Sequence, residues 1–150
     1  MKGLADNKKA YFNYEILEKF EAGISLIGQE VKSIKQGRMA LKGSYVVIDK
    51  NSEVFLIGAN VPPYQPKNTP KDYRPDRSRK LLLRKNEINY LIGKSREKGL
   101  TLVPLRVYTK NGKIKLEFGV GKGKKEFSKK ESIKRREADR DIRRALRARG

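Results

Sequence analysis

The side chains that could carry out chemistry are few, because the 150-residue sequence contains neither histidine nor cysteine. Nucleophilic Ser-His-Asp and Cys-His systems need an imidazole base, and zinc sites draw mainly on cysteine and histidine, so the sequence excludes these sites. Disulfide bonds are excluded as well. Carboxylate chemistry with magnesium, as in a nuclease, remains possible. The acidic residues considered for it are Glu15, Glu18, Glu21, Glu30, Asp72, Asp76 and Glu117.

Nearly all of these carboxylates stand singly among basic residues, which favours a different role for them. We interpret them as surface counter-charges that keep a strongly basic protein soluble. The sequence therefore predicts a protein that is not an enzyme and that holds no metal and no cofactor.

Phosphate-binding loops are also absent once the spacing of the glycines is checked. Gly93-Lys94-Ser95 copies the end of a Walker A loop, but Ile88 stands where that loop requires its first glycine. The glycines between residues 119 and 123 lack the G-x-G-x-x-G spacing. No aromatic RNP1 segment and no G-x-x-G pair is present, which argues against the RRM and KH classes of RNA-binding domain.

The balance of charge points to a polyanionic partner. Lysine and arginine number 37 against 17 aspartate and glutamate, a formal net charge of +20. Charge alone does not separate RNA from DNA or from an anionic membrane. The membrane is the weakest of the three, because no stretch of about 18 apolar residues and no signal-peptide pattern exists. We expect a soluble, cytoplasmic protein.

The elements that would position these residues are mostly short β-rich segments. Apolar residues stand at mostly even spacing over residues 11–27, as in a strand, although residues 15–21 fit a helix equally well. Residues 30–36 predict a short helix that Gly37 ends. Residues 45–48 and 53–57 are β-branched runs joined by a polar turn, and they predict a hairpin.

The second half of the chain also predicts a helix and a hairpin. Residues 85–97 carry one apolar face and predict a helix. Residues 100–108 and 113–120 flank Asn111-Gly112, the strongest short signal for a hairpin. Residues 61–79 read as a long exposed loop, in which Tyr64 and Tyr73 either stack on bases or pack down on the body of the protein.

Together these elements predict a mainly β fold, an OB-type closed antiparallel β-barrel with two short helices, over residues 1–121. Residues 122–150 form a basic C-terminal tail with 13 lysines and arginines against 5 acidic residues. This tail buries too little apolar surface to fold alone, so we expect it to be disordered when free. The i, i+4 pairs Glu131–Arg135 and Asp139–Arg143 favour a helix once it binds.

Several segments resemble the SsrA-binding protein family in the family's own order. They are NKKAYFNY at residues 7–14, FEAGISLIGQEVKSIKQGR at 20–38, RSRKLLLRKNEI at 77–88, KGLTLVPLRVY at 98–108, FGVGKGKKEF at 118–127 and RREADRDIRRAL at 135–146. The resemblance implies a protein that binds the tRNA-like domain of transfer-messenger RNA (tmRNA, or SsrA RNA). It further implies that this protein is required to deliver tmRNA to stalled ribosomes in trans-translation, and that it acts as a monomer.

The resemblance also implies which residues make these contacts. The RNA-binding residues of the barrel would be Glu30, Lys32, Arg79, Lys80, Lys122, Lys124 and Lys125. The tail would bind ribosomal RNA of the decoding region through Lys129, Lys130, Lys134, Arg135, Arg136, Arg140, Ile142, Arg143, Arg144 and Leu146. Cations suit a phosphate backbone, and a guanidinium can grip phosphate with two hydrogen bonds.

Some positions fit this pattern less simply. Glu30 would accept from a base amine or a 2′-hydroxyl or orient a lysine, or else it is a first-turn helix carboxylate favoured by the dipole. Ser128 stands where the family commonly has aspartate, and residues 62–76 lack the histidine-bearing pattern of relatives. The competing hypothesis is a general binder of single-stranded RNA or a ribosomal protein, and an enzyme ranks third.

Overall fold

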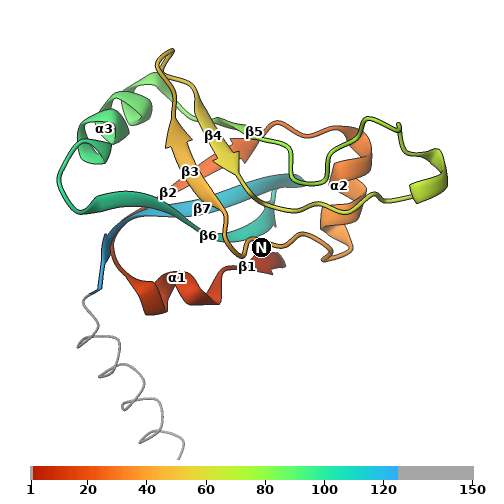
Figure 1. Ribbon diagram of the computed structural model, residues 1–150, viewed down its shortest axis with the longest axis horizontal. Helices are drawn as coiled ribbons and strands as arrows, with labels where there is room; N and C mark the ends of the chain where they lie inside the picture. Colours follow the sequence, from red (N-terminus) through yellow and green to blue (C-terminus); the bar gives the residue numbers. More distant parts are fainter. Residues whose placement is uncertain (1, 125–150) are drawn as a thin grey trace, which may run out of the picture.

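The computed structural model describes residues 2–124 (Figure 1). Its strands are β1 (Lys2–Asp6), β2 (Tyr14–Ile24), β3 (Tyr45–Ile48), β4 (Val54–Ile57), β5 (Arg79–Leu82), β6 (Leu100–Lys110) and β7 (Lys113–Gly123). Its helices are α1 (Lys8–Asn13), α2 (Gly28–Lys35) and α3 (Lys85–Ser95), with a 3-10 turn, η1 (Pro66–Asn68).

The two predicted hairpins are confirmed. β3 and β4 pair with Val46 opposite Leu56, and β6 pairs with β7 along their whole length. The turn between β6 and β7 places Asn111 at φ 52° and Gly112 at φ 76°. Both values lie in the left-handed region that a type I′ turn requires, which is why Asn-Gly suits this position.

The remaining predictions of helices and strands are confirmed in part. The helices expected at residues 30–36 and 85–97 exist, as α2 and α3. The strand expected at residues 11–27 is wrong at its start, because α1 runs to Asn13 and β2 begins only at Tyr14. α1 as well as β1 and β5 were not predicted, and β7 runs two residues past the expected boundary at 121.

The seven strands form a single antiparallel sheet in the order β1-β6-β7-β2-β5-β4-β3. The prediction of a closed barrel is therefore wrong. β1 and β3 are the two edges, and no ladder joins them in the described part of the chain. β1 pairs only with the second half of β6, from Arg106 to Thr109.

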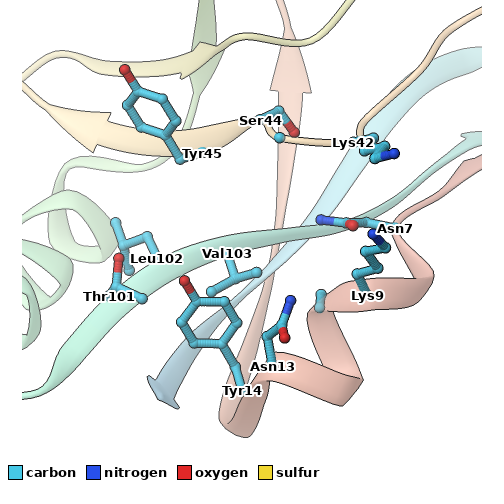
Figure 2. A pocket seen from close by; sticks show the side chains of 12 residues that line it. Asn7, Lys9, Asn13, Tyr14, Lys42, Ser44, Tyr45, Thr101, Leu102 and Val103 are labelled. Carbon is cyan, nitrogen blue, oxygen red and sulfur yellow. The ribbon is translucent and has the colours of Figure 1, made fainter. Parts of the chain in front are cut away.

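The pairing of β1 with β6 stops beside Pro104 for a physical reason. Proline has no N–H, so an edge ladder cannot run through it. The carbonyl of Pro104 accepts a hydrogen bond from Asn7 Nδ2 at 2.8 Å, and the carbonyl of Leu105 accepts one from Asn7 N–H at 2.9 Å. The chain then turns away into α1, which leaves a cleft between the first half of β6 and the start of β3 (Figure 2).

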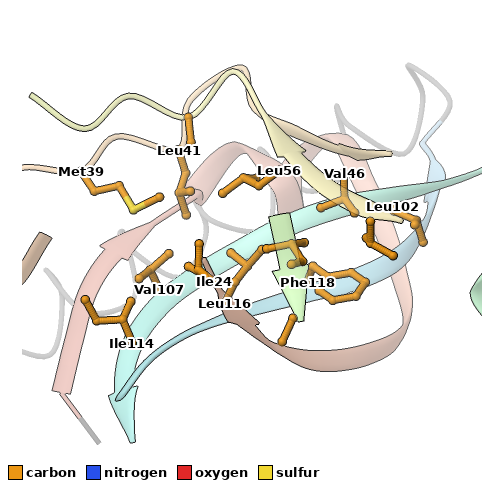
Figure 3. Packing of buried hydrophobic residues seen from close by; sticks show 14 of the residues in the cluster. Ile24, Met39, Leu41, Val46, Leu56, Leu102, Val107, Ile114, Leu116 and Phe118 are labelled. Atoms are coloured by element: carbon orange, nitrogen blue, oxygen red, sulfur yellow. The ribbon is translucent and has the colours of Figure 1, made fainter. Parts of the chain in front are cut away.

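The main core lies inside the curl of the sheet (Figure 3). Phe118 and Leu116 of β7 are fully buried there, together with Leu56 of β4 and Ile34 of α2. The core side chains come from every second residue of β7, which is the alternation the sequence showed. These contacts hold α2 and the β3–β4 hairpin against the long strands.

A smaller cluster lies on the other face of the sheet, beneath α1. Ala10 of α1 packs on Val103 and Leu105 of β6. The glycine at position 119 in β7 is explained by the close approach of the neighbouring strand β2. A Cβ there would lie 2.8 Å from the carbonyl oxygen of Glu18 and 2.8 Å from a methyl group of Ile16.

Candidate nucleic-acid interface

Glu30 occupies the first turn of α2, where the end of β2 leads directly into the helix. Its Oε1 accepts a hydrogen bond from the backbone N–H of Ile27 at 3.0 Å. This bond satisfies one of the backbone donors that a helix start leaves without a partner. Glu30 thus lies in the first turn of α2, where a carboxylate is favoured by the helix dipole.

The same carboxylate lies in a buried cluster with Arg79. Both side chains have no exposed surface. Arg79 Nε and Nη2 donate to Glu30 Oε2 at 2.9 and 2.6 Å. The other three N–H donors of Arg79 point to the carbonyls of Ala59, Pro75 and Arg77, at 2.9 to 3.0 Å. All five donors of this guanidinium thus have acceptors within the protein.

Two further residues complete this cluster. Arg77 donates to both oxygens of Glu30, and its side chain is 32% exposed. The hydroxyl of Tyr73 donates to the carbonyl of Val61 at 2.7 Å and lies 3.3 Å from Glu30 Oε2. Tyr73 therefore packs down on the body of the protein, and the loop that carries it is fixed to α2 and β5.

The carboxylate of Glu30 is ionised at neutral pH. Burial raises the pKa of Glu30, but hydrogen bonds from Arg77, from the Ile27 N–H and from Arg79 outweigh burial, so that pKa is lowered. A buried ion pair with all its donors satisfied avoids the cost of an uncompensated charge. We name Glu30, Tyr73, Arg77 and Arg79 the Glu30 cluster.

Cationic side chains stand on the outer side of this cluster. Residues of β5 alternate between buried and exposed, so Arg79 points inward and Lys80 outward. Lys80 Nζ lies 3.8 Å from Glu53 in a pair whose side chains are 49% and 44% exposed. Such pairs contribute about 0–1 kcal/mol, so a phosphate can displace the carboxylate at little cost. Lys32 Nζ lies 5.5 Å above the ring of Tyr64.

The remaining described cations of the predicted site lie elsewhere. Lys122 pairs across the sheet with Glu15, and the N–H of Lys124 donates to the carbonyl of Asn13. They therefore lie at the start of β2, whereas Lys80 and α2 lie near its end. The eleven residues of β2 separate the two groups by about 30 Å along the strand. An RNA molecule that contacts both groups of cations must therefore extend along the whole of β2.

The structure thus divides the predicted site residues into three sets. Lys32, Lys80 and Lys122 are exposed and Lys124 is partly exposed, while Glu30 and Arg79 are buried and present no atom to a ligand in this conformation. A direct contact of those two with RNA stays a prediction. Lys125 and all the tail residues predicted to bind ribosomal RNA lie outside the described residues.

Sequence reasoning missed Arg77 and Tyr73 as members of the Glu30 cluster. The sequence did contain a signal that Arg79 is buried. Side chains alternate between the two faces of a strand, so Arg79 shares the buried face of Leu81. No comparable signal marks Arg77 or Tyr73, since both lie in an irregular loop.

Three of the other acidic residues considered for catalysis, Glu21, Asp76 and Glu117, lie within ion-pair distance of a basic side chain, as counter-charges would. Glu117 lies 3.5 Å from Arg106, and Asp76 lies 3.7 Å from Arg74. Glu21 accepts from Tyr108, and this bond lowers its pKa more than burial raises it. Within residues 2–124 no three acidic side chains are grouped so that they could hold a metal ion. The helices of that part are all too short or too polar to cross a membrane.

Known proteins are similar to this chain over most of its length. The family model described as "SmpB protein" matches residues 4–148. An SsrA-binding protein of Geobacillus kaustophilus is 51% identical over 148 residues, covering 99% of this chain and 94% of the relative. One from Carboxydothermus hydrogenoformans is 51% identical over 146 residues, with 97% of each chain covered.

A third relative and a solved structure agree with these matches. The SsrA-binding protein of Trichormus variabilis is 48% identical over 145 residues, covering 97% of this chain and 93% of the relative. A chain from a structure described as "tmRNA-SmpB: a journey to the center of the bacterial ribosome" is 43% identical, with a TM-score of 0.66 over 81% of this chain and 84% of the other. This chain therefore belongs to the SmpB family of SsrA-binding proteins.

Proposed function

We propose that this protein binds the tRNA-like domain of tmRNA and is required for its delivery to stalled ribosomes in trans-translation. The observation that carries the proposal is the family match over residues 4–148, together with 43% identity to a chain from a tmRNA–SmpB structure. A formal charge of +20 supports it, because each phosphate that a lysine or arginine neutralises releases counterions. Because the proposed action is at ribosomes, we propose that the protein acts in the cytoplasm.

In this proposal the protein acts by binding and not by catalysis, as a monomer on one RNA. Lys32 and Lys80 contact the RNA near α2, and Lys122, Lys124 and Lys125 contact it at the other end of β2. Glu30 and Arg79 support this contact indirectly, because their buried ion pair holds α2 and β5 in a fixed position relative to each other. The exposed cations are then already in place when the RNA arrives, which lowers the entropy cost of binding.

A reconstituted translation reaction tests the proposal. Ribosomes stall on a messenger RNA without a stop codon, and tmRNA is added with or without this protein. We expect the tag peptide to be added only when the protein is present. Tagging that is equal in its absence would contradict the proposal.

The tail has a separate test. Because β7 ends at Gly123, a chain that stops after Lys124 keeps every described element. We propose that this shortened protein still binds the tRNA-like domain but no longer supports tagging, since residues 129–146 would contact ribosomal RNA. Tagging at the full rate by the shortened chain would show that the tail has no such role.

A further inference from the structure

The opening of the sheet leaves a cleft that, within residues 2–124, is lined by none of the predicted RNA-binding residues and by no member of the Glu30 cluster. Its volume is about 530 Å³, within the range of about 300–1,000 Å³ common for small-ligand sites. Figure 2 shows one wall formed by residues 42–45, which lead into β3, and the facing wall formed by α1 and the start of β2. The first half of β6 forms the floor.

The cleft combines an apolar floor with a polar rim. Leu102 and Val103 of β6 line the floor and are almost fully buried. Lys42 stands on one wall and Lys9 on the other, and none of the twelve lining residues is acidic. A ligand that fits this cleft therefore carries negative charge beside an apolar surface.

Amide and aromatic side chains add the remaining chemistry. Asn13 and Tyr14 extend from the end of α1 toward the open space (Figure 2). Tyr45 belongs to the opposite wall, and its ring points outward from the rim with 49% of the residue's surface exposed. An amide can donate to and accept from the edge of a base, and a tyrosine ring can stack on its face. The two lysines suit the phosphate attached to that base.

We propose that this cleft binds one unpaired nucleotide of an RNA partner, with its base between the apolar floor and a tyrosine ring and its phosphate near Lys42 or Lys9. The inference rests on the proposed RNA-binding function, because proteins read RNA mainly through bases that are splayed out of a helix. Two sources share this chemistry: the tRNA-like domain of tmRNA and the RNA of the ribosome.

Two variants of the full-length protein test the inference against matched controls. Tyr45→Ala removes an exposed ring of the cleft, and Tyr11→Ala removes a ring that is 45% exposed on α1 and does not line the cleft. Lys42→Gln removes a cation of the rim, and Lys50→Gln removes an exposed cation from the turn between β3 and β4. Thermal unfolding checks that all four variants are folded.

Each variant is titrated with the tRNA-like domain and, separately, with ribosomes, at low and at raised salt. We expect Tyr45→Ala to weaken binding in one of the two titrations about tenfold more than Tyr11→Ala does. In the same titration Lys42→Gln should lower the slope of log Kd against log salt by about one relative to Lys50→Gln. The titration that changes identifies which RNA supplies the nucleotide.

The inference is overturned if the wild type binds both partners while each cleft variant behaves as its control does in both titrations. A wild type that binds neither partner would overturn the proposed function and the inference together. Because Lys42 is exposed, its variant decides the question even if Tyr45→Ala proves unstable.

Discussion

Replacing Glu30 by glutamine should cost this protein a large part of its stability. Glutamine keeps the size of the side chain but turns one carboxylate oxygen into an NH₂ group. Both oxygens accept from donors, Oε1 from Ile27 and Arg77 and Oε2 from Arg77 and Arg79. In either orientation the amide NH₂ therefore faces other donors, and the fully buried charge of Arg79 loses its counter-charge.

Removing one partner of a buried ion pair costs about 3–5 kcal/mol. That is about a fifth or more of the free energy of unfolding of a typical domain, which is about 5–15 kcal/mol. The matched control is Glu97→Gln, which breaks the 3.3 Å pair with Lys94 at a site where the side chain of Glu97 is 53% exposed. An exposed pair of this kind contributes about 0–1 kcal/mol.

Urea unfolding followed by far-UV circular dichroism measures both variants. A loss of less than about 1 kcal/mol in Glu30→Gln, similar to that in Glu97→Gln, would refute the view that the cluster depends on this charge.

The effect of Glu30→Gln should also depend on pH. The pKa of Glu30 is lowered in the folded protein, so its charge stabilises the fold above the unfolded value of about 4.3 and stops doing so as pH falls through the folded value. The difference in unfolding free energy between wild type and Glu30→Gln should therefore be largest near neutral pH and shrink on acidification. A difference that stays constant down to about pH 3 would mean that the carboxylate charge is not its source.

Three further predictions concern β7, the hairpin turn and the surface cations. Gly119→Ala should lower the free energy of unfolding by about 1–3 kcal/mol, because the new Cβ would lie 2.8 Å from the carbonyl oxygen of Glu18. In the control Gly123→Ala the new Cβ meets nothing within 4 Å, so the stability should change by about 0.5 kcal/mol or less. Urea unfolding compares the two variants, and equal losses would contradict the packing argument. Gly112→Ala should cost about 1–2 kcal/mol in the same assay because φ is 76° there, and an unchanged midpoint would be the wrong outcome. Lys80→Gln should weaken binding to the tRNA-like domain and lower the slope of log Kd against log salt by about one without changing stability; an unchanged slope in filter binding would exclude a phosphate contact.

The sequence predicts those parts of the fold that local signals control. Asn111-Gly112 is sufficient to place the hairpin of β6 and β7, because few residues other than asparagine and glycine adopt positive φ readily. The apolar face of α3 likewise places that helix. The short α1 escaped prediction because its six residues carry one buried side chain, Ala10, and so no periodic apolar stripe.

Closure of the sheet is not a local property, and there the prediction failed. Whether a barrel closes depends on which edges meet, and here Asn7 binds the carbonyls of Pro104 and Leu105, residues that lie 97 or more positions away in the sequence. The Glu30 cluster is similar, since Arg77 and Arg79 approach Glu30 from 47 and 49 positions away. The family resemblance named Glu30 and Arg79, but only the structure shows that they bind each other.

The most direct test of the central claim is a titration of the full-length protein with the tRNA-like domain of tmRNA and with an unstructured RNA of equal length. Both titrations are made near physiological salt, about 0.15 M, and at raised salt. The account predicts tighter binding to the tRNA-like domain, with a preference that survives at raised salt. Equal affinities that fall together as salt rises would contradict it, because nonspecific neutralisation of phosphates would then explain all of the binding.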